Sequence, residues 1–473
     1  MSGMGLLDRI DDRLGDGLEA MLCRHHARRL RGLGWGEVLD EPGTGWFTPR
    51  APVREGCRVD VLVDGKQALP AMVEAIKGAR SYVHIAGWHS SPGFRPTRGE
   101  DARTLRELLA EAAERVPVRV LLWAGPPVPA FEPTRKRARA ACQEFMRDSK
   151  VRCVLDARER TLHCHHEKLV IVDDEVAFVG GMDFTALEGD RHDSPEHPAD
   201  RPIGWHDTAM RAEGPVVADV ADHFRQRWVE VAGEALPSPR TPAPAGNSTV
   251  QFVRTIPEKT YEFAPRGEFG ALDAYLRALR SAQDLVYLEN QFFWSPEIAE
   301  VLIDKLRHPP HNRFRVVLVL PRKPSNGADT TRGQLGRLLD ADDGNQRLLA
   351  VTLTSHDGDN KVPVYVHAKL AVVDDKWLTA GSANLNEHSL FNDTEPNLVT
   401  DDAAVVKDVR LRLWAEHLRR PVSELDGEPA DVVDRLWRPL AEGKEKHRLT
   451  LLPGVSRRAG RLQGPLRGLL VDG

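Results

Sequence analysis

One short segment of this chain occurs twice, and it constrains the fold more than any other feature. Residues 166–173 read HEKLVIVD, and residues 367–374 read HAKLAVVD. In an extended strand, residues two apart point to the same side, so each His and Lys is expected side by side. The four apolar residues between Lys and Asp are typical of a strand buried on both faces. A buried strand that occurs twice, with a polar pair at its start, predicts two similar halves.

The segments around each copy alternate between strand-like and helix-like patterns. The first half has predicted strands at 59–63, 81–86, 118–123, 151–155 and 176–179, and predicted helices at 68–79, 102–113, 135–146 and 215–231. The second half has predicted strands at 250–254, 284–289, 315–320 and 348–353, and predicted helices at 269–281, 296–306, 331–339 and 403–418. Strands joined by helical crossovers favour a mostly parallel sheet with helices on both faces. We therefore predict an α/β fold in which two such halves pack about a pseudo-two-fold axis around one shared site.

The chain has 473 residues, more than one ordinary hydrophobic core accommodates. Residues 235–248 are rich in Pro and contain little to bury, which predicts a linker. The expected divisions are an N-terminal helix and lead-in (1–55), a first half (56–234), the linker (235–248), a second half (249–425) and an Arg- and Gly-rich tail (426–473).

The two ends of the chain allow two interpretations each. Residues 4–30 have the spacing of an amphipathic helix with a basic end, which suits a membrane surface or packing on the main body. Acidic residues on its polar face favour packing. The tail from Ala441 onward either contacts acidic head groups or loosely covers the body, and we favour the second interpretation.

Composition limits the class of protein. The net charge of −5 gives no global attraction to nucleic acid, and five scattered cysteines suit a reducing compartment. The N-terminus lacks the pattern of a secretory signal, and no apolar run reaches the length of a membrane span. The expectation is a cytoplasmic monomer that contacts a membrane surface peripherally and does not bind nucleic acid.

Matching polar residues follow each copy of the repeated segment. Gly180-Gly181-Met182-Asp183 follows the first copy, and Gly381-Ser382-Ala383-Asn384 follows the second at the same spacing. Farther along, each half has a carboxylate that can orient a histidine, Asp207 in the first and Glu395 in the second, with Asp393 as a rival. The candidate catalytic residues are His166, Lys168, Asp173, His367, Lys369 and Asp374, and the candidate supporting residues are Gly181, Asp183, Asp207, Ser382, Asn384 and Glu395.

The doubled pattern H-x-K-x4-D followed by G-[GS]-x-[DN] resembles the phospholipase D superfamily, most of all its bacterial phospholipase D-like enzymes. Residues 287–293, YLENQFF, are similar to a segment ahead of the second motif in lipid-cleaving members. The resemblance covers about residues 56–420 and implies a phospholipid phosphodiesterase that also transfers to alcohols. It implies His166 as the nucleophile and His367 as the general acid and base, although two such similar copies leave the reverse assignment open.

The chemistry of these residue types is consistent with that implication. A neutral imidazole attacks phosphorus without charge repulsion, and a second histidine moves the proton of the departing alkoxide. Lys168 and Lys369 would offset charge on the non-bridging oxygens. We expect no cofactor and no metal, and we expect Asp173 and Asp374 to anchor their loops rather than to carry protons.

Three local features allow more than one interpretation. The cluster His163-Cys164-His165-His166 is compatible with zinc, but alternate strand residues point in opposite directions and partner ligands are missing from the segment, so support of the site is preferred. The charged loop 187–204 is either a lid or head-group reader, or an inert surface insertion. The stretch 292–294, FFW, is either core or channel wall.

The function alternatives are ordered as follows. A cardiolipin-synthase-like transferase comes after the phospholipase, although many of those enzymes carry membrane spans. A nuclease is next, since its small members have one motif per chain and the acidic charge here disfavours nucleic acid. A catalytically silent lipid- or phosphate-binding protein is last, because both His/Lys pairs are intact.

Overall fold

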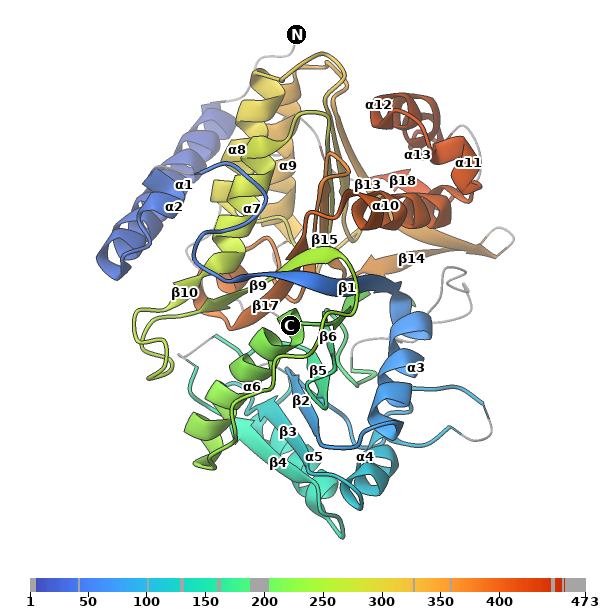
Figure 1. Ribbon diagram of the computed structural model, residues 1–473. Helices are drawn as coiled ribbons and strands as arrows, with labels where there is room; N and C mark the ends of the chain where they lie inside the picture. Colours follow the sequence, from blue (N-terminus) through green and yellow to red (C-terminus); the bar gives the residue numbers. More distant parts are fainter. Residues whose placement is uncertain are drawn as a thin grey trace.

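A computed structural model describes residues 6–40, 43–99, 102–127, 132–159, 163–187, 204–325, 328–357, 360–443, 447–452 and 455. It confirms the α/β fold class, with two mixed sheets flanked by helices (Figure 1). The first half lies in the lower part of this view and the second half in the upper part. Most of the loop 187–204 and the end of the tail lie outside the described residues.

The first sheet has the strand order β4-β3-β2-β5-β6-β8-β1. Its strands are β1 (Val53–Val63), β2 (Val83–Gly87), β3 (Val118–Trp123), β4 (Arg152–Asp156), β5 (Leu169–Val172), β6 (Val176–Gly180) and β8 (Thr208–Glu213). β2, β3 and β4 are parallel, whereas the remaining pairs are antiparallel. Its helices are α3 (Asp64–Lys77), α4 (Leu105–Ala113), α5 (Arg135–Met146) and α6 (Val216–Ala232).

The second sheet repeats this order with extra strands at its edges, β18-β13-β12-β11-β15-β16-β17-β9-β10. Its strands are β9 (Ser248–Ile256), β10 (Glu268–Phe269), β11 (Leu285–Asn290), β12 (Arg315–Val319), β13 (Leu348–Asp357), β15 (Lys369–Val373), β16 (Trp377–Gly381), β17 (Glu395–Thr400) and β18 (Leu449–Leu451). β11, β12 and β13 are parallel, as β2, β3 and β4 are. Its helices are α7 (Gly270–Ser281), α8 (Pro296–Arg307), α9 (Ala328–Asp342) and α10 (Ala403–Leu418).

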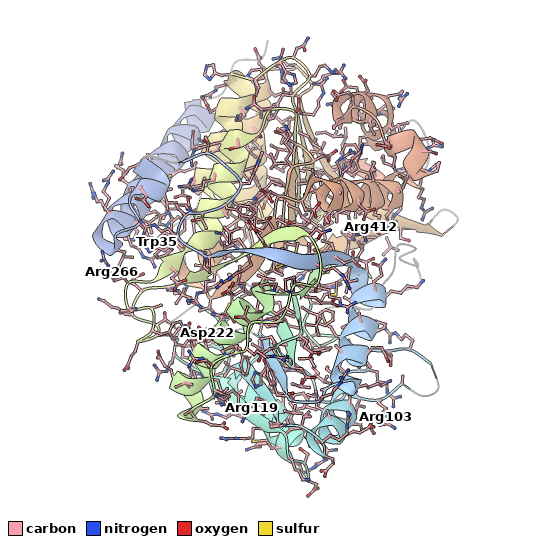
Figure 2. The ribbon with its side chains drawn as sticks, viewed as in Figure 1. Trp35, Arg103, Arg119, Asp222, Arg266 and Arg412 are labelled. Atoms are coloured by element: carbon pink, nitrogen blue, oxygen red, sulfur yellow. The ribbon has the colours of Figure 1, made fainter. Side chains whose placement is uncertain are left out.

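The sheets are joined rather than merely packed together. The start of β1 pairs with β9 and its end pairs with β8, so one strand belongs to both sheets (Figure 1). A second connection pairs β14 (Asn360–Val366) with β7 (Gly204–His206). Arg412 of α10 donates to the backbone oxygen of Val61 in β1 at 2.9 Å (Figure 2). One apolar cluster includes Val61 of the first half and Trp414 of the second, so the halves share a core.

The N-terminal helix packs on the second half. α1 (Leu6–Leu33) lies along the outside of α8 (Figure 1), and His26 Nδ1 lies 2.6 Å from Glu297 Oε1. Arg29 donates to Glu258 Oε2 at 2.6 Å, so the basic end of the helix contacts protein. After it come the short helix α2 (Glu37–Asp40) and β1.

The residues that follow α10 are folded as far as Ala441, and in the segment from Ala441 onward, which we expect to cover the body loosely, residues 449–451 form β18. α11 (Val422–Leu425), α12 (Pro429–Val432), the π-helical turn η2 (Val433–Trp437) and α13 (Arg438–Ala441) follow α10, and β18 adds to the edge of β13. Trp437 is fully buried between other aromatic rings, which explains the attachment.

Candidate active site

The first motif places His166 and Lys168 immediately ahead of β5. Both side chains are buried, and the Lys168 ammonium donates to the backbone oxygen of His166 at 2.6 Å. This bond holds the two residues on one side of the strand, as their spacing predicts. The backbone N–H of His166 donates to the oxygen of Thr394 at 3.1 Å, which ties this segment to the second half.

The second motif has the same geometry at β15. Lys369 donates to the backbone oxygen of His367 at 2.5 Å, and both side chains are buried. The backbone N–H of His367 donates to the oxygen of His206 at 2.8 Å, again across the boundary between the halves. The indole of Trp205 packs on the His367 ring, with centroids 4.3 Å apart.

Each motif histidine is oriented by a carboxylate of the opposite half. His166 Nδ1 lies 2.9 Å from Glu395 Oε1, and His367 Nδ1 lies 2.7 Å from Asp207 Oδ2. A carboxylate at Nδ1 keeps the proton on that nitrogen and leaves Nε2 for chemistry. The rival Asp393 instead accepts the backbone N–H of Cys164 at 2.8 Å. Neither half alone contains both a motif histidine and the carboxylate that orients it, so the two motifs form one site.

The two lysines have different neighbours. Lys168 Nζ lies 3.3 Å from Asp183 Oδ2, a buried ion pair. Lys369 Nζ donates instead to the amide oxygen of Gln291 at 3.1 Å, and Asn384 donates to the same oxygen at 3.3 Å. Lys168 therefore contacts a carboxylate, whereas Lys369 contacts the amide of Gln291, and this difference breaks the symmetry of the site.

Gly181 and Ser382 hold the two carboxylates in place in different ways. A Cβ at Gly181 would lie 2.2 Å from Asp207 Oδ1, so a larger residue would displace that carboxylate. Ser382 occupies the matching position, and its hydroxyl donates to Glu395 Oε2. Ser389 donates to the other oxygen of Glu395, so both oxygens are fixed.

The structure places Asp173 and Asp374 just after β5 and β15, at the ends away from the histidines. This agrees with the expected anchoring role and corrects their place among the candidate catalytic residues. The Asp173 carboxylate accepts backbone N–H groups of residues 80–82, and the Asp374 carboxylate accepts those of residues 283–285, at 2.7–2.8 Å. These bonds satisfy the backbone just ahead of β2 and at the start of β11. Both residues anchor the strand next to the motif strand.

The reverse side of the first motif contacts a buried charged network. Glu167 accepts from Arg227 at 2.7 Å, and Arg227 also donates to Asp156 at 2.7 Å. Burial alone would raise the pKa of Asp156, but the charges of His165 and Arg227 outweigh burial and hold it well below its usual range. His165 lies 3.1 Å from Asp156, so it supports the motif from behind. In the second motif, the positions that match His165 and Glu167 are occupied by the apolar residues Val366 and Ala368.

A second buried network lies beside Asp207. His206 is fully buried, with Nδ1 3.0 Å from Asp64 Oδ1 and Nε2 2.8 Å from Glu289 Oε2. Burial alone would lower the pKa of His206, but the two carboxylates outweigh it and raise that pKa well above its usual value. An imidazolium held on both sides fixes the backbone that supports Asp207 and His367.

Several of these contacts were not predicted. Gln291 was in the segment that suggested the resemblance, yet nothing in its spacing marked it as a partner of Lys369. No sequence pattern predicted the contact of Ser389 with Glu395 or the contacts of His206 with Asp64 and Glu289. The stretch 292–294 is core, because all three side chains are at most 1% exposed. Tertiary contacts alone identify this second layer of the site.

None of the described helices combines the length and apolarity that crossing a membrane requires. Among the solved and curated proteins similar to this chain, three illustrate the range. The crystal structure of phosphatidylserine synthase from Haemophilus influenzae Rd KW20 superposes with a TM-score of 0.50 at 14% identity, over 83% of this chain and 96% of that one, which shows a shared fold.

Phospholipase D A of Dictyostelium discoideum is 27% identical over 78% of this chain and 36% of its own length. Phospholipase D alpha 4 of Arabidopsis thaliana is 25% identical over 81% of this chain and 70% of its own length. This chain thus spans about a third of the first relative. Both relatives are eukaryotic, so the resemblance to bacterial members stays a prediction.

Two family models match, one in each half. The model described as "Phospholipase D" matches residues 75–204, which include the first motif. The model described as "Cardiolipin synthase, PLD-like domain" matches residues 275–415, which include the second. The matched segments together span more than half of the chain, and on these grounds the protein belongs to the phospholipase D superfamily.

Proposed function

We propose that this protein is a phospholipase D-type phosphodiesterase that cleaves phospholipids through a covalent phosphohistidine. The observation that supports this most is the pair of His/Lys sets in which each histidine is bound by a carboxylate of the opposite half. Such a set supplies a nucleophile, a proton carrier and two cations without further groups. Residues 56–234 and 249–425 are proposed as the two units that create the site, joined by the linker 235–248.

In the proposed first step, His166 Nε2 attacks phosphorus and the bond to the head-group oxygen breaks. Glu395 keeps the proton on Nδ1 of His166 and stabilises the positive charge that the ring gains. His367, protonated on Nε2, gives that proton to the departing alkoxide. The products of this step are the free head-group alcohol and a phosphatidyl group bound to His166.

In the second step, a water molecule attacks the phosphohistidine and His367 takes up its proton. The P–N bond breaks, phosphatidic acid leaves and His166 regains its neutral form. Lys168 and Lys369 lie next to the two histidines, where their charges offset charge that builds on the non-bridging oxygens. Asp183, Asn384 and Gln291 are proposed to position the lysines. A primary alcohol in place of water gives transfer instead of hydrolysis.

The proposed substrate is a phospholipid because the relatives that align over most of this chain carry the name phospholipase D. The lipid would be reached from a membrane surface as a peripheral contact. A monomer suffices, since one chain contributes both motifs. We propose a cytoplasmic location, as the few scattered cysteines suggest.

A phosphatidyl transferase is the second candidate. The match of residues 275–415 to the model described for cardiolipin synthase favours it specifically. Its first step would be the same, and the hydroxyl of a second lipid would replace water in the second.

Trapping the intermediate tests the mechanism. Phospholipid labelled with ³²P in the phosphate is mixed with enzyme and quenched in acid after milliseconds to seconds. The wild type and His308→Ala, an exposed control histidine, are expected to retain label on the protein, and His166→Ala is expected to retain none. Label that persists in His166→Ala and disappears in His367→Ala would reverse the assignment of the two roles. Absence of label in the wild type at every quench time would refute the covalent route.

A substrate panel then separates the candidates. Vesicles of mixed phospholipids with ethanol, vesicles of phosphatidylglycerol alone, and plasmid DNA are incubated with wild type and His166→Ala. Phosphatidylethanol and phosphatidic acid support the phospholipase, cardiolipin supports the transferase, and nicked DNA would identify a nuclease. Inactivity on all three would refute the proposed activity.

A further inference from the structure

Three side chains with metal-ligand chemistry meet on the boundary between the halves, beside the site but outside it. His163 belongs to the first half, just ahead of the first motif, whereas His388 and Asp393 begin and follow the π-helical turn η1 (His388–Asn392) of the second half. One ligand atom from each residue lies within 4.8 Å of the other two. His163 Nδ1 lies 3.7 Å from Asp393 Oδ1, and the two imidazole rings have centroids 5.4 Å apart.

The backbone around these residues holds them together. Cys164 donates its N–H to Asp393 Oδ1 at 2.8 Å, and Thr394 donates its own to the oxygen of Cys164 at 3.2 Å. Asp393 donates its N–H to the oxygen of His388 at 2.8 Å, which closes the π-helical turn. The positions of all three residues are therefore fixed by bonds that do not require an ion. A carboxylate held by a backbone N–H is also the usual way in which a metal ligand is oriented.

Two other groups of histidines and carboxylates in the described part of the chain have a different character. Both contain His206, whose two ring nitrogens lie 2.8–3.0 Å from carboxylate oxygens of Glu289 and Asp64. These are hydrogen-bond distances, and protons occupy the space that a metal would need. His206 is also fully buried, so an ion has no route to it. The side chain of His163 is 15% exposed, which gives solvent access to its group.

We propose that His163, His388 and Asp393 form a binding site for a divalent transition metal, with Zn²⁺ as the best fit. Two imidazoles and one carboxylate are a usual ligand set for zinc with a fourth position left to water. Ligand atoms about 2.0–2.2 Å from a tetrahedral zinc lie roughly 3.4 Å from one another. The separations here are 3.7 Å for one pair and at most 4.8 Å for the others, so small side-chain rotations close the site.

The ion would act as a cross-link between the halves. One ligand comes from the segment that leads into His166, and the other two come from the turn whose Ser389 holds Glu395. Because Glu395 orients His166, the cross-link would stabilise the boundary on which the active site depends. The reaction itself has no step at this metal, and the inference is independent of the proposed lipid activity.

Binding is tested on the full-length protein after chelation and removal of the chelator. ZnCl₂ is titrated by calorimetry, and CoCl₂ is titrated with visible absorption as a spectroscopic probe. We expect one ion per chain, a cobalt spectrum of nitrogen and oxygen ligands, and a melting temperature that rises by a few degrees when zinc exceeds its Kd about a hundredfold. His163→Gln and His388→Gln are each expected to weaken zinc binding by more than about tenfold.

The matched control is His308→Gln, an exposed histidine on the surface of the second half, which should bind zinc as the wild type does. His388 is buried, and His388→Gln could fail to fold for that reason alone. His163 is partly exposed, so His163→Gln still tests whether this group binds zinc. Unchanged affinity in His163→Gln, absence of binding in the wild type, or a thiolate-to-cobalt charge-transfer band would overturn the proposal. The last outcome would place the ion on a cysteine.

Discussion

The carboxylate that orients His367 provides the sharpest test of the proposed mechanism. Asp207→Asn preserves the shape of the side chain while it removes the charge. The Asn oxygen can still accept the backbone N–H of Thr208, which Asp207 Oδ1 accepts at 2.8 Å. Its NH₂ group would then face His367 Nδ1 at the position of the present 2.7 Å contact. That donor forces the ring proton onto Nε2 and disfavours the imidazolium.

The size of the effect follows from burial. Asp207 and His367 are 1% and 4% exposed, so solvent cannot replace the lost charge. Removing one partner of a buried charged pair costs about 3–5 kcal/mol. If the transition state loses this whole interaction, the rate falls by roughly 10² to 10⁴, at about 1.4 kcal/mol for each factor of ten. The close contact between Gly181 and Asp207 leaves the side chain little space to move away.

The assay compares two leaving groups. Initial rates are measured on phosphatidylcholine and on a p-nitrophenyl ester of phosphatidic acid, with circular dichroism to verify folding. Since p-nitrophenolate departs without a proton, Asp207→Asn should release it in a rapid burst and then hydrolyse the phosphohistidine slowly. Glu395→Gln should slow both substrates, because it affects the nucleophile. Equal losses on both substrates in Asp207→Asn, or a loss below about tenfold, would refute the role of His367 as general acid.

Three further outcomes are expected. Asp374→Ala should lower stability to urea by about 2–4 kcal/mol and spare the activity of the folded fraction, because three backbone donors lose their acceptor; loss of activity at full stability would contradict the anchoring role. EDTA should leave the rate of lipid hydrolysis unchanged even where it lowers the melting temperature, and a rate lost with EDTA and restored by zinc would place a metal in the reaction. The raised pKa of His206 means that its contribution to stability is complete below about pH 6.5 and is lost as the pH rises through the higher folded pKa. The difference in melting temperature between wild type and His206→Gln should therefore narrow only at alkaline pH, and a difference that narrows near pH 6.5 would contradict an imidazolium between two carboxylates.

The sequence by itself determined the duplicated fold and the two His/Lys pairs. Strand periodicity places His166 beside Lys168 and His367 beside Lys369 whatever surrounds them, since residues two apart in a strand always share a side. The alternation of apolar strands and amphipathic helices likewise fixed the α/β class. These are local properties, which a pattern along the chain encodes directly.

Short segments with polar or mixed composition were less predictable. The β7 and β14 strands pair with each other across the two halves, and β14 also pairs with β13 of its own half. β7 has only three residues, Gly204–His206, and it pairs with β14 of the other half, so its own residues give little local signal of a strand. The segment after α10 is a similar case, because Trp437 is held by the rings of Tyr287 and Trp414.

Only the tertiary structure decided which carboxylate serves which histidine. Sequence order suggests that Asp207 supports the first half and Glu395 the second, but each reaches across to the other motif. The missing partners of His163 were likewise found in the opposite half, at His388 and Asp393. The physical reason is strand pairing across the boundary between the halves. Because His165 bridges to Thr394, the next residue, Glu395, faces the first motif. Because β7 pairs with β14, Asp207, the residue after β7, faces the second motif. Contacts between distant segments of a chain are set by packing, and no periodicity within either segment encodes them.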